Sequence, residues 1–112
     1  MTRYFLVPAL VALLASCASV DDLRAKDPVF FSTTEKSPQA YGECLISNWR
    51  NLGENVTSRQ IRNGLDVYTQ GRTNVNEVVR VQHYDAKTHV TMYARTQYGF
   101  QDMMQAANLC LR

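Results

Sequence analysis

The sequence has few of the residue patterns that mark an enzyme. It contains two histidines, His83 and His89, and none of its serines lies in a G-x-S-x-G motif. It has no glycine-rich loop of the kind that binds phosphate, and its carboxylates form no periodic pair on one face of an element. These absences predict a protein that is not an enzyme and that holds neither a metal ion nor a cofactor.

Long hydrophobic runs are also lacking. The apolar run at residues 5–14 follows a positive residue, Arg3, and is interrupted by Pro8. A bilayer-spanning helix needs about 20 apolar residues, so this run is too short to be one. Its length and flanks are typical of a secretory signal peptide. The alternative, a buried core helix, is disfavoured by Pro8 and by the change of composition after Ser19.

Leu14-Ala15-Ser16-Cys17 closes this run and resembles the lipobox of bacterial lipoproteins. The resemblance implies that residues 1–16 are removed and that Cys17 becomes the acylated first residue. Ala18, which is not acidic, implies delivery to the outer membrane, with the chain facing the periplasm. Several acyl chains, at about 0.8 kcal/mol per buried CH₂, make such an anchor effectively permanent.

Loss of residues 1–16 leaves 96 residues, enough for one domain. A domain of this size buries a modest fraction of its surface and gains from a covalent link. Cys44 and Cys110 remain as an even pair in an oxidising compartment, which predicts a disulfide, with two free buried thiols as the alternative. The net charge of +2 falls to +1 without Arg3, which argues against a nucleic-acid partner.

The rest of the chain divides into a spacer and a folded domain. Residues 17–28 comprise the lipidated cysteine and a polar, charged stretch without period, which predicts a tether. Residues 29–112 form the domain, beginning with a short strand at 29–33. Ser37-Pro38 starts a predicted helix that ends near Leu52, before Gly53. Its predicted buried stripe is Tyr41, Cys44, Leu45, Asn48 and Leu52, with Trp49 beside it as a core residue rather than a ligand platform.

A run of strands follows this helix. Asn63-Gly64 predicts a hairpin between residues 56–61 and 65–70, with Ile61 opposite Leu65 and a bulge at Gly64. The strand at 56–61 is mostly polar and suits an edge. Residues 76–84 and 89–95 alternate with period two. A turn centred on residues 86–87 pairs Val81 with Met92 on one face and Arg80 with Tyr93 on the other.

The chain ends in a predicted helix at 100–111, whose buried stripe is Phe100, Met103, Ala107 and Cys110. Two helices on one face of an antiparallel sheet of about four to five strands, joined through Cys44 and Cys110, give an α+β two-layer sandwich. The predicted register places the two histidines on opposite faces, which disfavours a shared metal and makes His83 a residue at the edge of the core.

Both helices are needed on the inner face, so the outer face is expected to be bare. Tyrosine and arginine are enriched at binding hot spots, which makes this face a candidate binding surface. The alternative is an ordinary solvated sheet stabilised by cross-strand pairs. The residues expected to project from it are Tyr68, Arg80, Gln82, Tyr84, His89, Tyr93 and Arg95.

A further resemblance is carried by Ser37-Pro38-x-x-Tyr41-x-x-Cys44, Trp49, Asn63-Gly64 and a terminal Ala106-Ala107-x-x-Cys110. This pattern is similar to that of small uncharacterised proteobacterial lipoproteins and spans most of the mature chain. It implies location and fold, because those proteins have no agreed activity.

Two functions are expected from this location and surface. One is a non-catalytic outer-membrane lipoprotein with a periplasmic binding or accessory domain, held in the membrane through Cys17 and bound to a protein of the cell envelope. The other is an immunity protein that neutralises a toxin acting in the periplasm. A third, weaker interpretation is a small hydrolase with polar residues converging in a cleft.

Overall fold

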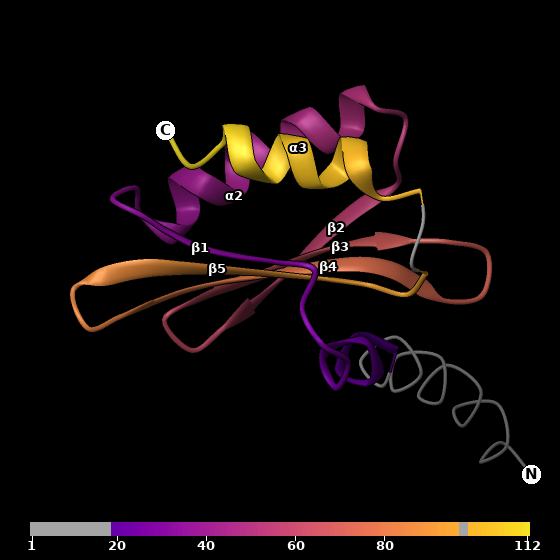
Figure 1. Cartoon of the computed structure of the whole chain (residues 1–112), viewed down its shortest axis with the longest axis horizontal. Helices are drawn as coiled ribbons and strands as arrows, with labels where there is room; N and C mark the ends of the chain where they lie inside the picture. The colour runs from indigo at the N-terminus through magenta and orange to yellow at the C-terminus, as the bar shows by residue number, and fades with distance from the viewer. Residues whose placement is uncertain (1–18, 97–98) are drawn as a thin grey trace, which may run out of the picture.

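A computed structural model of the chain describes residues 19–96 and 99–112. The predicted signal peptide, residues 1–16, and the predicted acylation site, Cys17, lie outside the described residues. Five antiparallel strands form one sheet in the order β1-β5-β4-β3-β2, and two helices, α2 and α3, pack on one face of it (Figure 1). The predicted α+β architecture is confirmed, with β2 at an edge. The elements are β1 (Phe30–Thr34), α2 (Pro38–Asn51), β2 (Val56–Ile61), β3 (Gly64–Gln70), β4 (Val75–Tyr84), β5 (Lys87–Ala94) and α3 (Gln101–Leu109).

Helix α2 begins and ends where the sequence predicts. The Ser37 hydroxyl accepts a hydrogen bond from the Ala40 amide at 3.1 Å, and Pro38 occupies the first turn, where its missing N–H costs nothing. The chain turns away at Gly53, with φ +88°. The predicted stripe is partly wrong, because Asn48 and Leu52 are exposed and Trp49 is fully buried instead.

The main core lies between the helices and the sheet face that they cover, here called the inner face. Trp49 and Tyr41 bring polar atoms into this core, and both find acceptors on α3. The Trp49 indole N–H donates to Met103 O at 3.0 Å, and the Tyr41 hydroxyl donates to Ala107 O at 2.6 Å. Burial raises the pKa of Tyr41, so this hydroxyl stays protonated. The predicted disulfide between Cys44 and Cys110 is confirmed and links the same two helices.

The predicted Gly64 bulge is wrong. The β2–β3 loop consists of Arg62 and Asn63, and Ile61 pairs with Gly64 rather than Leu65. Asn63 takes the left-handed conformation, with φ 63°. Gly64 is needed for a different reason: a Cβ there would lie 1.8 Å from Val81 O on β4. Its glycine therefore permits close strand packing inside the sheet.

The β4–β5 hairpin has the predicted faces but not the predicted partners. Its two-residue loop, Asp85 and Ala86, has positive φ at both positions, 51° and 64°, the geometry that joins twisted strands most tightly. The register is therefore shifted by two residues. Val81 pairs with Val90, and Arg80 lies opposite Thr91 rather than Tyr93. A two-residue shift preserves both faces, because side chains alternate with period two.

The outer face is not bare, which corrects another expectation. Residues 19–24, expected to belong to a tether, are helical and pack against the sheet face opposite α2 and α3 (Figure 1, indigo). We call them the N-terminal helical segment. Val20 and Leu23 are fully buried there against Val75 and Val78. Val20 and Leu23 are spaced three residues apart, so a single helical turn presents both to the sheet.

A bulge in β4 prepares this contact. Tyr68 pairs with Val78 and Gln70 pairs with Val75, so β4 has one more residue than β3 over the same stretch. The extra residue changes the alternation, which lets Val75 and Val78 join one apolar cluster with the N-terminal helical segment. The Ser19 hydroxyl also accepts a hydrogen bond from the Val75 amide at 3.0 Å.

Candidate binding surface

All seven residues of the predicted binding surface lie on or beside strands of the outer face, but the structure divides them into three groups. Tyr68 and Tyr93 pack beside the N-terminal helical segment. The guanidinium of Arg95 also binds at this segment. Its Nε donates to Val75 O at 2.8 Å, and its Nη2 donates to the Ser19 hydroxyl at 3.2 Å. Arg80 belongs to a charged cluster at the centre of the face. Gln82, Tyr84 and His89 remain at the end of the sheet that the segment does not cover.

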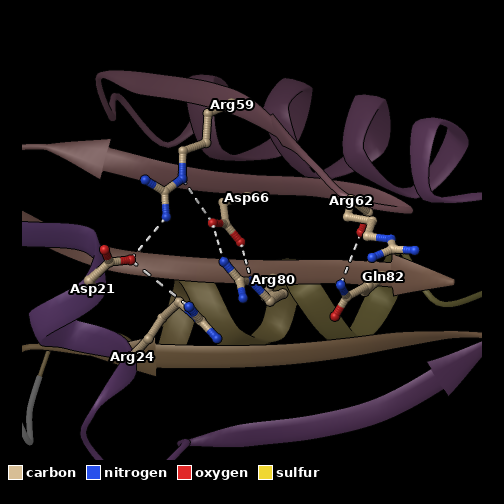
Figure 2. A network of polar contacts seen from close by, with 7 residues as sticks. All are labelled: Asp21, Arg24, Arg59, Arg62, Asp66, Arg80 and Gln82. Atoms are coloured by element: carbon tan, nitrogen blue, oxygen red, sulfur yellow. Dashed lines mark hydrogen bonds and ion pairs between the residues drawn. The ribbon is translucent and has the colours of Figure 1, made fainter. Parts of the chain in front are cut away.

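The charged cluster consists of Asp21, Arg24, Arg59, Asp66 and Arg80 (Figure 2). Its centre is the Asp66 carboxylate, which is fully buried. Arg80 donates to both of its oxygens, from Nε to Oδ1 at 2.8 Å and from Nη2 to Oδ2 at 2.9 Å. Arg59 Nε donates to Oδ2 at 3.0 Å. Two guanidinium groups thus satisfy one buried carboxylate, the arrangement that a buried charge requires.

The same cluster ties the N-terminal helical segment to the sheet. Arg59 Nη2 donates to Asp21 Oδ1 at 3.2 Å, and Arg24 Nη1 lies 3.9 Å from that oxygen. Burial lowers the pKa of Arg59, but hydrogen bonds and charge from Asp66 and Asp21 outweigh burial and raise it. Arg59 therefore keeps its charge. Within the cluster, the guanidinium of Arg80 is engaged by Asp66 rather than free on the outer face.

Asp66 is the residue that sequence reasoning missed. Arg59 and Arg80 are its direct neighbours on the two flanking strands, in the pairs Arg59–Asp66 and Asp66–Arg80. The signal was therefore present as complementary charges in register. It was hidden because the predicted β2–β3 loop was one residue too long, which placed Arg59 opposite Val67.

The uncovered end of the outer face carries an aromatic set of three rings: Phe31, Tyr84 and His89. The rings of Tyr84 and His89 are stacked, with centroids 3.7 Å apart and planes 6° from parallel. Phe31, on the neighbouring strand β1, lies 6.5 Å from His89, centroid to centroid. Phe31 is 63% exposed and Tyr84 is 45% exposed. Rigid aromatic side chains that are exposed together are typical of protein-binding hot spots.

His89 is held in place by its surroundings. Its Nε2 lies 3.2 Å from Tyr84 O, and its Nδ1 is buried without a hydrogen-bond partner. Gln82 lies opposite His89 on β4 and donates from Nε2 to Arg62 O at 3.0 Å. Among the described residues of the predicted surface, only Tyr84 and His89 present rings that no helix covers and that pair with no charged group. Phe31, which the sequence analysis left out, completes it.

An open cleft of about 680 Å³ lies away from this surface, between the start of α2 and the β2–β3 loop. His83 lines it, and its Nδ1 lies 3.2 Å from the Thr88 hydroxyl. Ser37 also lines it, but its hydroxyl caps α2. In residues 19–96 and 99–112, no three His, Cys, Asp or Glu side chains are grouped to hold a metal ion. His83 and His89 lie on opposite sheet faces, as the alternation predicts.

Comparison of the chain with protein-family models, curated proteins and solved structures finds no match. None of the helices in the described part of the chain is long and apolar enough to cross a membrane.

Proposed function

We propose that the chain is a non-catalytic lipoprotein of the outer membrane, anchored through Cys17, whose periplasmic domain binds a protein of the cell envelope. The aromatic set carries the binding part of this proposal. Three rings from β1, β4 and β5 lie together at the uncovered end of the sheet, and two of them are strongly exposed. A partner that covers them gains about 25 cal/mol for each Å² of apolar surface buried.

Binding is tested by affinity capture from envelope extract, with the acylated protein as bait. Tyr84→Ala removes a stacked, exposed ring and is expected to cost about 2 kcal/mol of binding, a loss of roughly thirtyfold. Leu109→Ala is the matched control, since Leu109 is 57% exposed on α3, across the molecule. Equal capture by the two variants would contradict the proposed surface. A captured envelope component supports the accessory function, whereas a captured secreted toxin points to immunity.

The anchor is tested separately. Cys17→Ser removes the acylation site implied by Leu14-Ala15-Ser16-Cys17. We expect the variant to stay unprocessed by the lipoprotein pathway, with residues 1–16 retained, and to carry no acyl chains by mass spectrometry. An acylated, membrane-held Cys17→Ser product would refute the anchor and leave the aromatic set unaffected.

A further inference from the structure

The two edges of the sheet differ in how they are protected. An edge strand presents unpaired backbone N–H and C=O groups, and proteins usually block such an edge with a charge, a proline or a covering element. β2 carries Arg59 in its middle, and Arg50 Nη2 donates to its Val56 O at 3.4 Å. β1 has the sequence Phe-Phe-Ser-Thr-Thr, with no charge and no proline. Among the labelled elements, extensive contacts of β1 are confined to β5.

The side chains of β1 also leave this edge of the sheet unprotected. Phe31 and Thr33 point to the outer face and are exposed, and Phe31 is the most exposed large apolar side chain in the described part of the chain. Exposed apolar surface beside an unpaired edge is the combination that favours addition of another strand. The charge at the two ends of β1 is balanced: Lys26 and Asp27 precede it, and Glu35 and Lys36 follow it.

We propose that β1 is an interface between two copies of this chain, paired antiparallel about a two-fold axis at Ser32. Such a pairing is self-complementary and continues the sheet across the axis. A register centred on Ser32 pairs all five residues of β1 and keeps outer-face side chains opposite one another, Phe31 against Thr33. Each end of the strand meets the opposite end of its copy. Because each end is flanked by one acidic and one basic residue, the pairing brings no block of like charges together.

This pairing also joins the two aromatic sets. Phe31 and the second copy's Phe31 become diagonal neighbours on adjacent strands, about 7–8 Å apart. Each copy's stacked Tyr84 and His89 then extend one aromatic surface on both sides of the axis. Binding of the envelope partner to this doubled surface rests on the proposed function. The strand pairing itself does not.

Cross-linking at the axis tests the pairing. Directly opposite residues in antiparallel strands have Cα atoms about 4.5–5.5 Å apart, within the range of about 4.4–6.8 Å that a disulfide spans. Ser32→Cys in a full-length chain that carries Cys17→Ser leaves one free thiol, because Cys44 and Cys110 are bonded to each other. Under mild oxidation we expect a covalent dimer to form at least tenfold faster than with Ser58→Cys. Ser58 is the matched control, an exposed serine on the opposite edge strand, β2.

A second substitution separates strand pairing from random collision. Thr33→Lys adds the missing charge to the β1 edge and is expected to slow dimer formation by the Ser32→Cys chain at least tenfold, with the circular dichroism spectrum unchanged. Sedimentation of the uncross-linked protein should show a matching loss of dimer. The pairing is overturned if the Ser32→Cys chain cross-links no faster than the Ser58→Cys chain. It is also overturned if Thr33→Lys leaves the rate of cross-linking by the Ser32→Cys chain unchanged. Neither experiment requires acylation, so the pairing can fail while the proposed function stands.

Discussion

The two faces of the sheet are covered by helices in different ways. On the inner face, α2 and α3 bury a large aromatic and aliphatic core, are bonded covalently through Cys44 and Cys110, and satisfy their buried polar atoms. On the outer face, the N-terminal helical segment buries two apolar side chains, Val20 and Leu23. Both buried polar side-chain atoms without a partner in the described residues, Arg24 Nε and His89 Nδ1, lie on this side.

This difference predicts that the sheet carries a permanent cover on one face and a removable cover on the other. Elements with few buried apolar contacts open at a smaller free-energy cost than the rest of the domain. We therefore expect the inner cover to unfold only with the whole domain, and the outer cover to open by itself. Substitutions in the two covers should differ accordingly in their effect on stability.

Removing the disulfide should have the largest effect. Cys44→Ala with Cys110→Ala frees a closed loop of roughly 65 residues, and the expected loss is about 4 kcal/mol in the free energy of unfolding. Urea denaturation of the double variant measures it, with the wild-type protein as reference. A loss of well under 1 kcal/mol would show that packing alone holds the inner cover.

Breaking the charged cluster should come next. Asp66→Asn leaves Arg59 and Arg80 facing a neutral amide where a buried carboxylate stood, at an expected cost of about 3 kcal/mol. The arginine side chains are 26% and 21% exposed and can partly recover water, so we expect the lower end of the range for buried ion pairs. Asp85→Asn, in the exposed β4–β5 loop, is the control. Its midpoint of thermal unfolding should lie near that of the wild type.

Cutting back one leucine on each face compares the two covers directly. Leu45→Ala, in the inner core, should lower the free energy of unfolding by about 3 kcal/mol. Leu23→Ala should lower it by about 1 kcal/mol or less, because the segment can detach while the domain stays folded. Amide hydrogen exchange distinguishes the cases: protection should fall in residues 19–24 and persist in β4. Uniform loss of protection after Leu23→Ala would make the outer cover part of the core.

The smallest effect concerns Glu77, at the inner rim of the sheet. Burial raises the pKa of Glu77. The hydrogen bond from the Thr69 hydroxyl opposes this shift, and the nearby charge of Glu54 reinforces it. The folded protein therefore holds this proton to higher pH than the unfolded chain, and the stability it confers at acid pH is lost as pH rises through the raised value. Glu77→Gln should remove that pH dependence and stabilise the domain at pH 7 by no more than about 0.5 kcal/mol. Denaturation midpoints of both proteins between about pH 4 and pH 7 measure it.

Much of the fold could be predicted because local signals agreed with one another. Ser37, Pro38 and Gly53 mark both ends of α2, and the cysteines fall on helix faces that meet over the inner face of the sheet. Alternation assigned the faces of β4 and β5 correctly even though their partners were wrong, because the error in the β4–β5 register was an even number of residues.

The candidate surface was predicted less well, because it depends on loop length and on a short segment that packs through few residues. Asp85 and Ala86 both take positive φ, which nothing in alanine's chemistry favours, so the tight turn was not anticipated. Val20 and Leu23 are two apolar residues among charged ones, too few for a periodic signal. Val75 joins their partner site only because of the β4 bulge, which is a feature of strand pairing rather than of local sequence.

The packed N-terminal helical segment sets a working distance. A flexible stretch of 12 residues, such as 17–28 was expected to be, has a typical end-to-end distance of about 20 Å. With Ser19 hydrogen-bonded to β4, one residue separates Cys17 from Ser19 in sequence, a reach of at most about 7 Å. If the chain is acylated at Cys17 as proposed, docking of this segment would therefore hold the domain close to the membrane. Undocking would restore the typical distance of about 20 Å between Cys17 and the domain, and under the proposed function it would widen the range in which the domain can meet a partner.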